Sequence, residues 1–177
     1  MAPSCSLWPV TAGSSRPEDR GPKMSDASAQ ISDGVRAAGL LEEACHPVPG
    51  SPDASRIEVV RELARDLGRQ LATLSDLAGE DATSDVLAEA AICCADLATL
   101  AACNAPDLPP DAAPRATSAA RLAAGAVGAL GPMVESKSAD LGDGHAENLL
   151  RDARSAGWRA EFAARLAEES SAERPPG

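Results

Sequence analysis

The sequence predicts an all-α protein, a four- to five-helix up-down bundle with a disordered N-terminal segment and C-terminal tail. Alanine, the strongest helix former, is the commonest residue within an apolar fraction of 44%, while the aromatic residues are reduced to one Phe and two Trp. Apolar residues also recur every three or four positions, which is the period of a helix with one buried face. A length of 177 residues suits one domain of this kind.

The expected elements follow from local signals along the chain. Residues 1–23 are rich in Pro, Ser and Gly and lack an apolar period, so we expect a disordered segment, with Met1 or Met24 as the true start. A single helical-bundle domain then covers residues 24–170, and residues 171–177 form a disordered tail. Periods and breaks predict helices over about 28–45, 55–78, 83–104, from 111 to the DLGDG turn at 140–144, and from 143 to 170.

Candidate capping residues stand at the starts of the later helices. Thr83 or Ser84 can cap the third helix, and Asp111 can cap the fourth, with Pro114 in its first turn. Asp143 is the candidate cap of the last helix.

Glycine and proline interrupt the pattern of the fourth helix. The ring of Pro132 would clash with the carbonyl of Gly128, so we expect a kink near Gly128–Gly131. Gly125, Gly128 and Gly131 recur at helical spacing, and we expect them to allow close approach of another helix. On the second helix, we expect a solvated face with ion pairs at i,i+3 spacing: Glu58 with Arg61, Glu62 with Arg65, and Asp66 with Arg69.

The net charge of −11 argues against nucleic acids and anionic membrane surfaces as partners, because both require clustered Lys and Arg. No stretch approaches the roughly 18 uncharged apolar residues of a membrane span, and the N-terminal stretch has no apolar core typical of a secretory signal. The five cysteines lack disulfide-framework spacing. We therefore expect a cytoplasmic protein with reduced thiols.

Three cysteines lie in one alanine-rich run, at positions 93, 94 and 103. At 3.6 residues per turn, Cys93, Cys94 and Cys103 point in three directions from the helix. Zinc-ligand spacing of cysteines and histidines is missing from the chain. We interpret these cysteines as small core residues and expect neither a metal nor a cofactor.

The same helix carries one polar stripe, formed by Asp85, Glu89, Asp96 and Cys103. Two interpretations stay open. In the first, the stripe lines a groove that binds a cation or an amine-bearing ligand. In the second it has a structural role: it is a solvated face, or its carboxylates pair with arginines of the last helix, namely Arg151, Arg154 or Arg159.

The last helix carries Trp158 and Phe162 at i,i+4 spacing, away from its alanine stripe. An apolar ridge on a second side of a helix must be covered, either by another helix of the same chain or by a partner. With the neighbouring Arg151, Arg154 and Arg165, these aromatic residues are candidates for an interface.

We therefore expect a non-catalytic cytoplasmic helical-bundle module for interaction or regulation, which self-associates or binds another protein. The alternative is a small-molecule enzyme or binding protein with an acidic pocket between helices. The position of the Asp85, Glu89, Asp96 stripe separates the two, because an enzyme needs these carboxylates in a cavity.

Overall fold

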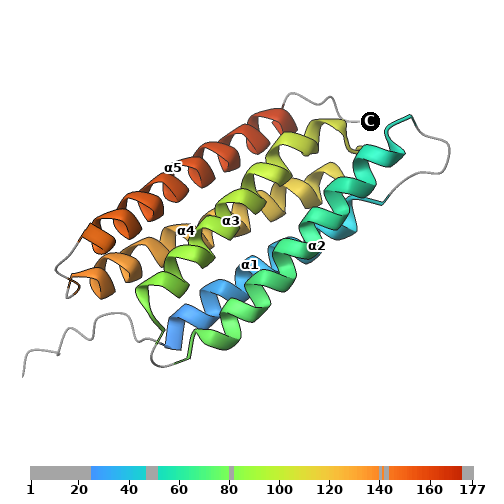
Figure 1. The fold of residues 1–177 in the computed structure, drawn as a ribbon. Coiled ribbons are helices and arrows are strands. Elements are labelled where there is room, and N and C mark those ends of the chain that lie inside the picture. Colours follow the sequence, from blue (N-terminus) through green and yellow to red (C-terminus); the bar gives the residue numbers. More distant parts are fainter. Residues whose placement is uncertain (1–24, 47–51, 80–81, 140, 142–143, 173–177) are drawn as a thin grey trace, which may run out of the picture.

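The computed structural model describes residues 25–46, 52–79, 82–139, 141 and 144–172. Within these residues the chain forms five α-helices, one short 3-10 helix and no strand, so the predicted all-α bundle is confirmed (Figure 1). The disorder expected at 1–23, and most of the expected tail, lie outside the described residues. The helices are α1 (Ser25–Ala44), α2 (Ala54–Leu77), α3 (Ser84–Asn104), η1 (Ala105–Asp107), α4 (Ala113–Ser138) and α5 (Gly144–Ala172).

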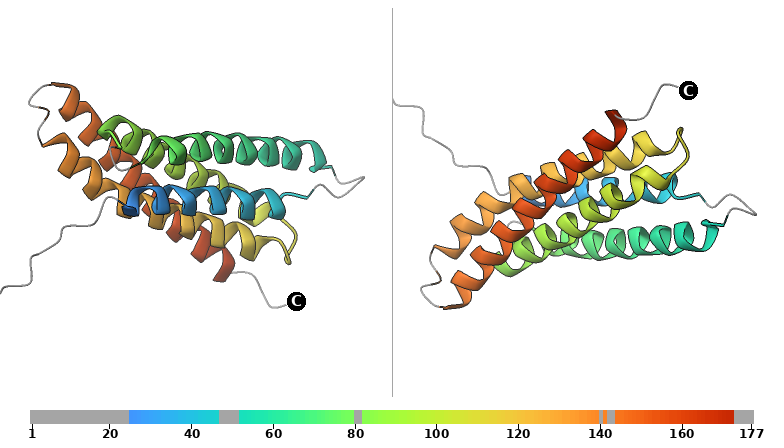
Figure 2. Two further views of the ribbon diagram at one scale, coloured as in Figure 1. Left: turned by 90° about the horizontal axis from the view of Figure 1, so that it is seen from below. Right: turned by 90° about the horizontal axis from the view of Figure 1, so that it is seen from above.

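Consecutive helices run up and down, and α3 and α4 lie at the centre of the bundle (Figures 1 and 2). The helix α5 covers one side of this central pair, whereas α1 and α2 lie on the other side. Of the five helices, α3 is in contact with all the others. As a result α5 has one face on the bundle and an opposite face without a neighbouring helix among the described residues.

Most of the buried apolar residues are alanines, so the helices pack through short side chains and lie close together. The closest approach involves Gly34 of α1: a Cβ atom placed there would lie 2.6 Å from Sγ of Cys94 on α3. A Cβ atom at Gly68 of α2 would lie 3.0 Å from that of Ala38. The absence of a side chain at Gly34 and Gly68 lets α1 lie close to α2 and α3.

The expectation that Gly125, Gly128 and Gly131 allow close helix approach is wrong within the described structure. A Cβ atom at any of the three would meet nothing within 4 Å, so there is open space beside each of these glycines. The helix α4 continues through Pro132 up to Ser138, and the kink expected near Gly128–Gly131 stays a prediction. Since Gly128 is exposed, water can hydrate the carbonyl group that Pro132 leaves without a donor.

The predicted caps have different outcomes. Thr83 is confirmed as the cap of α3, since its Oγ1 accepts a hydrogen bond from the backbone N–H of Val86 at 3.4 Å. Asp111 does not cap α4, because the residue at the cap position is Ala112, which cannot accept such a bond; Pro114 does lie in the first turn. Asp143 lies outside the described residues.

Ion pairs tie α2 to its neighbours. Arg65 was expected to pair with Glu62 but instead reaches α1, where its Nε and Nη2 donate to Oε1 of Glu42 at 3.0 and 2.6 Å. The pairs of Arg61 with Glu58 and of Arg69 with Asp66 form as predicted. The long side chain of Arg65 thus joins α1 and α2, whereas the sequence pattern indicated an ion pair within α2.

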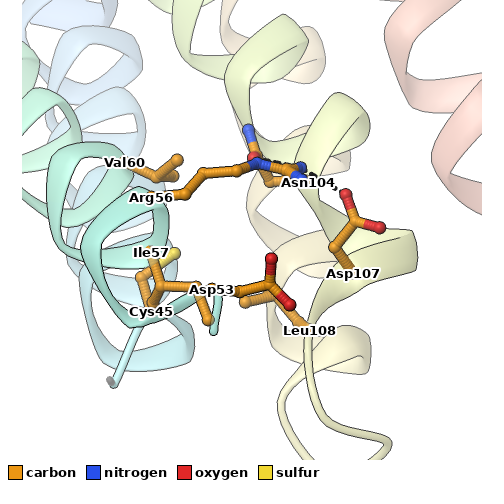
Figure 3. Close-up of a pocket in the computed structure, with 8 residues that line it drawn as sticks. All are labelled: Cys45, Asp53, Arg56, Ile57, Val60, Asn104, Asp107 and Leu108. Carbon is orange, nitrogen blue, oxygen red and sulfur yellow. Dashed lines mark hydrogen bonds and ion pairs between the residues drawn. The ribbon is translucent and has the colours of Figure 1, made fainter. Parts of the chain in front are cut away.

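The start of α2 is joined to the end of α3 by Arg56, which donates to Asn104 and Asp107 (Figure 3). The cavity beside this cluster has a volume of about 10 Å³, which is room for no more than a water molecule. We therefore assign the cluster a structural role, as a connection between the two helices.

The expectation that no stretch approaches a membrane span is wrong, because the stretch 84–107, which comprises α3 and η1, is long and apolar enough to cross a membrane. Of its most apolar window, 61% is buried inside the bundle. The apolar composition of α3 is therefore that of a helix packed on several sides by its neighbours.

Candidate interaction surface

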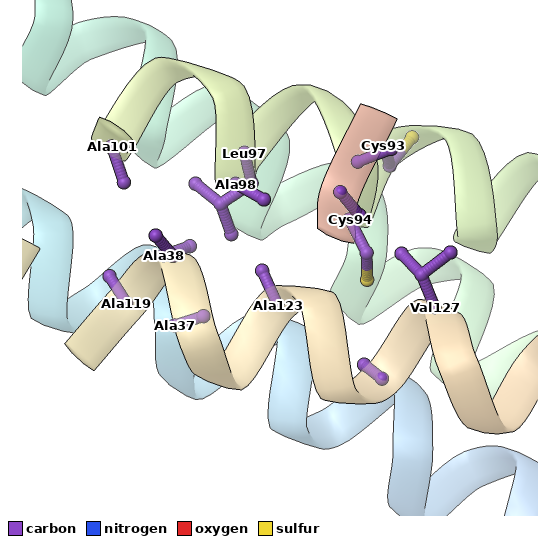
Figure 4. Packing of buried hydrophobic residues seen from close by; sticks show 14 of the residues in the cluster. Ala37, Ala38, Cys93, Cys94, Leu97, Ala98, Ala101, Ala119, Ala123 and Val127 are labelled. Carbon is purple, nitrogen blue, oxygen red and sulfur yellow. The ribbon is translucent and has the colours of Figure 1, made fainter. Parts of the chain in front are cut away.

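The cysteines of α3 divide into two buried residues and one exposed residue. Cys93 and Cys94 are buried, as predicted, and their sulfur atoms point in different directions (Figure 4). Burial raises the pKa of Cys94 to about 12 and, together with nearby Glu89 and Asp96, that of Cys93 to about 11. Thiols with such pKa values stay protonated at neutral pH and are poor nucleophiles. For Cys103, which is exposed, the interpretation as a core residue is wrong.

The three carboxylates of the polar stripe do not converge on one site. Asp85 accepts a hydrogen bond from Nε2 of His145 at 2.8 Å, at the start of α5. Glu89 accepts one from the side-chain amide of Gln70 on α2 at 3.1 Å. Further along, the stripe is bonded to the middle of α5, where the guanidinium of Arg159 donates to Asp96 at 2.5 Å.

One of these bonds, that of Asp96 with Arg159, is a pairing with an arginine of the last helix as in the second interpretation, whereas Asp85 and Glu89 bond to His145 and Gln70, which neither interpretation named. Of the three arginines considered as partners, Arg159 is the one that pairs with the stripe. In the described part of the chain, no group of three or more His, Cys, Asp or Glu side chains is arranged to hold a metal ion.

The aromatic residues of α5 form a stacked pair on the outside of the bundle. The ring centroids of Trp158 and Phe162 lie 5.8 Å apart, with 13° between the ring planes. Trp158 is 67% exposed and Phe162 is 52% exposed. No described helix of the same chain covers the pair, so the first of the two coverings considered above is not found among the described residues.

A hollow of about 150 Å³ lies between α3 and α5, next to this pair. It brings Cys103 together with Trp158 and Phe162, which the sequence analysis had placed on separate surfaces. Its walls are mainly apolar, and Arg159, which is among the residues that line it, donates to Asp96. The residues that line it are Thr99, Ala102, Cys103, Trp158, Arg159, Phe162, Ala163 and Leu166.

The three candidate interface arginines differ in their surroundings. Arg154 reaches α4, where its Nη2 lies 3.3 Å from Oε1 of Glu135. Arg151 has only its chain neighbour Asp152 within ion-pair distance, at 3.6 Å. Arg165 is exposed and makes no ion pair within the described structure. Two of the three guanidinium groups are thus available to a partner beside the aromatic pair.

Two larger hollows lie elsewhere. One of about 250 Å³ lies between α4 and α5, lined in part by Gly128, Gly131 and Gly157. The other, of about 450 Å³, lies where the end of α1 meets the start of α4, and its lining includes Glu43, His46, Asp111 and Arg115. The carboxylates of the α3 stripe line neither of them.

The chain matches no family model and no curated protein sequence at a significant level. The function is therefore inferred from the fold and from the surface of α5.

Proposed function

We propose that this protein is a non-catalytic interaction module of the cytoplasm that self-associates through the outer face of α5. The observation that carries the proposal is the stacked pair of Trp158 and Phe162, which is more than half exposed. Neighbouring exposed apolar side chains on one face of a helix form a patch, and association with a partner removes such a patch from water. Trp is also among the residues that contribute most to binding at interfaces.

The composition of the chain supports a protein as the partner. There is one Phe, there are two Trp and there is no Tyr, so two of these three large rings stand on one exposed face. The alanine-rich core does not use them. Covering both rings removes on the order of 200 Å² of apolar surface in each copy, which at about 25 cal/mol per Å² gives several kcal/mol before association costs.

The alternative, a small-molecule enzyme or binding protein, depended on an acidic pocket. Each carboxylate of the α3 stripe is bonded to a different side chain, and none lines the hollows described above. The buried thiols of Cys93 and Cys94 are protonated at neutral pH and so offer no nucleophile. These observations favour the interaction module.

The test is replacement of both rings. We expect the wild-type chain to sediment as a dimer and Trp158→Ala with Phe162→Ala to sediment as a monomer, with the helix content unchanged in circular dichroism. The matched control is Val59→Ala with Leu63→Ala, an exposed apolar pair of the same i,i+4 spacing on α2, and it should stay dimeric. A wild-type monomer at all concentrations, or a double-ring variant that still dimerises, would refute the proposal.

A further inference from the structure

The outer face of α5 carries a regular stripe of exposed residues. Its positions are separated by four and three residues in alternation, the a and d spacing of a helix that pairs with another helix. All of its members are exposed. The stripe, called here the outer stripe, comprises Arg151, Ser155, Trp158, Phe162, Arg165 and Glu169.

The order of residues along the outer stripe determines which orientation of two copies is favourable. The two rings occupy the middle of the stripe, Arg151 lies seven residues before Trp158, and Glu169 lies seven residues after Phe162. In a parallel pair, each of these charged residues would face the same residue of the other copy. In an antiparallel pair centred on Ala160, each Arg151 faces a Glu169, and each Trp158 faces a Phe162.

The end groups of the outer stripe are available for this pairing. In the part of the chain that the structure describes, Glu169 makes no ion pair, and the ion-pair partner of Arg151 is the half-buried Asp152, its neighbour in the chain. The α3–α5 hollow is lined by both Trp158 and Phe162, so apolar surface continues from the two rings into it.

We propose that two copies of this chain pair through the outer face of α5 in antiparallel orientation, about a two-fold axis that crosses α5 at the level of position 160. Arg151 of each copy then lies against Glu169 of the other, on either side of a central cluster of four rings. The inference rests on the proposed self-association and adds to it the register and the direction of the two helices.

Charge reversal tests the register in the full-length protein. Arg151→Glu and Glu169→Arg each replace two attractive pairs per dimer by two repulsive ones, so each should raise the dimer dissociation constant about tenfold at low salt. The double variant restores both pairs and should return within about threefold of wild type. Mixing the two single variants should also restore dimers, because each copy then supplies the charge that the other needs.

The sign of the net-charge change provides an internal control. The wild-type charge is −11, so general repulsion between copies would make Glu169→Arg dimerise more tightly than wild type, which is opposite to our expectation. Arg36→Glu changes the charge by the same amount as Arg151→Glu but lies exposed on α1, and it should leave the dissociation constant unchanged. All measurements are sedimentation equilibrium runs at several ionic strengths.

The outcomes distinguish the two proposals. If the ring variant becomes monomeric while both single reversals leave the dissociation constant unchanged, the surface is correct and the antiparallel register is wrong. In a parallel pair each charged residue faces its own copy, so reversing its charge replaces one like-charge contact by another. If the single reversals weaken the dimer and the double variant does not recover, the pairing of Arg151 with Glu169 is wrong. If wild type does not dimerise, self-association itself fails.

Discussion

Gly34 occupies a position on α1 where the side chains of two other helices leave no room for a Cβ atom. Besides the Cys94 sulfur at 2.6 Å, Cδ1 of Leu71 on α2 would lie 3.2 Å from such an atom. Real Cβ contacts are almost never as short as the first of these distances, so one side chain would have to move. The thiol of Cys94 thus fills the space that the missing side chain of Gly34 leaves between α1 and α3.

This contact predicts that Gly34→Ala destabilises the protein by about 1–3 kcal/mol, because overpacking outweighs the helix propensity gained. Cys94→Ala alone should cost about 1 kcal/mol. Together the two substitutions should be less destabilising than their sum, because removing Sγ makes room for the new Cβ. Urea unfolding of the four proteins of this cycle measures the coupling.

The control for that cycle lies on the same helix. A Cβ atom at Gly39 would meet nothing within 4 Å, so Gly39→Ala should stabilise the protein by about 0.5–1 kcal/mol. Additive effects of Gly34→Ala and Cys94→Ala would show that the two sites do not share one space.

At the scale of elements, α4 carries glycines that its packing in one copy does not require. Gly125 and Gly128 are exposed within a helix, where glycine costs about 1 kcal/mol relative to alanine. We predict that Gly125→Ala and Gly128→Ala each raise the free energy of unfolding by about 0.5–1 kcal/mol, measured by urea unfolding. If either substitution instead lowers the free energy of unfolding, the space beside that glycine is not open in solution.

The elements themselves could be predicted from the sequence, since the starts and ends of the helices agree with the expected ones to within a few residues. The period of apolar residues and the cap at Thr83 depend only on residues close together in the sequence, so they predict helices whichever neighbours these helices acquire. The failed predictions were those that depend on which helices become neighbours. Arg65 had a suitable partner at i−3 but found a better one, Glu42, on α1.

The candidate site shows the same division. That Trp158 and Phe162 share one side of α5 follows from their spacing, and their exposure matches their place opposite the alanine stripe. That Cys103 joins them could not be predicted, because nothing in the sequence shows that the end of α3 lies against the middle of α5. The spacing of residues within one helix therefore predicts which face of α5 carries the rings, but it cannot predict a hollow that forms between two helices.

At the scale of the whole molecule, three buried thiols make stability depend on alkaline pH. Burial raises the pKa of Cys45, Cys93 and Cys94 from 9.0 to about 11, 11 and 12. Below pH 9 both the folded and the unfolded chain hold these protons, and the full stability is present. As the pH rises from 9 towards 12 the unfolded chain releases protons that the folded chain retains, so the free energy of unfolding falls.

We therefore predict a decrease of urea midpoint between pH 9 and 11 that becomes smaller in Cys93→Ala and Cys94→Ala variants. The chain has no Tyr, whose ionisation would otherwise overlap with that of the thiols. An unchanged slope in the cysteine variants would assign the decrease to other groups. Cys103→Ala is the matched substitution at an exposed cysteine.

The central position of α3 also bears on how the chain is made. During synthesis α3 leaves the ribosome before α4 and α5 exist, and until then only α1 and α2 can cover it. Throughout that interval α3, which is apolar enough to enter a lipid bilayer, has the faces that α4 and α5 later cover exposed to solvent. The growing chain is therefore most exposed to chaperones, and to mistaken delivery to a membrane, while residues of the second half are being added.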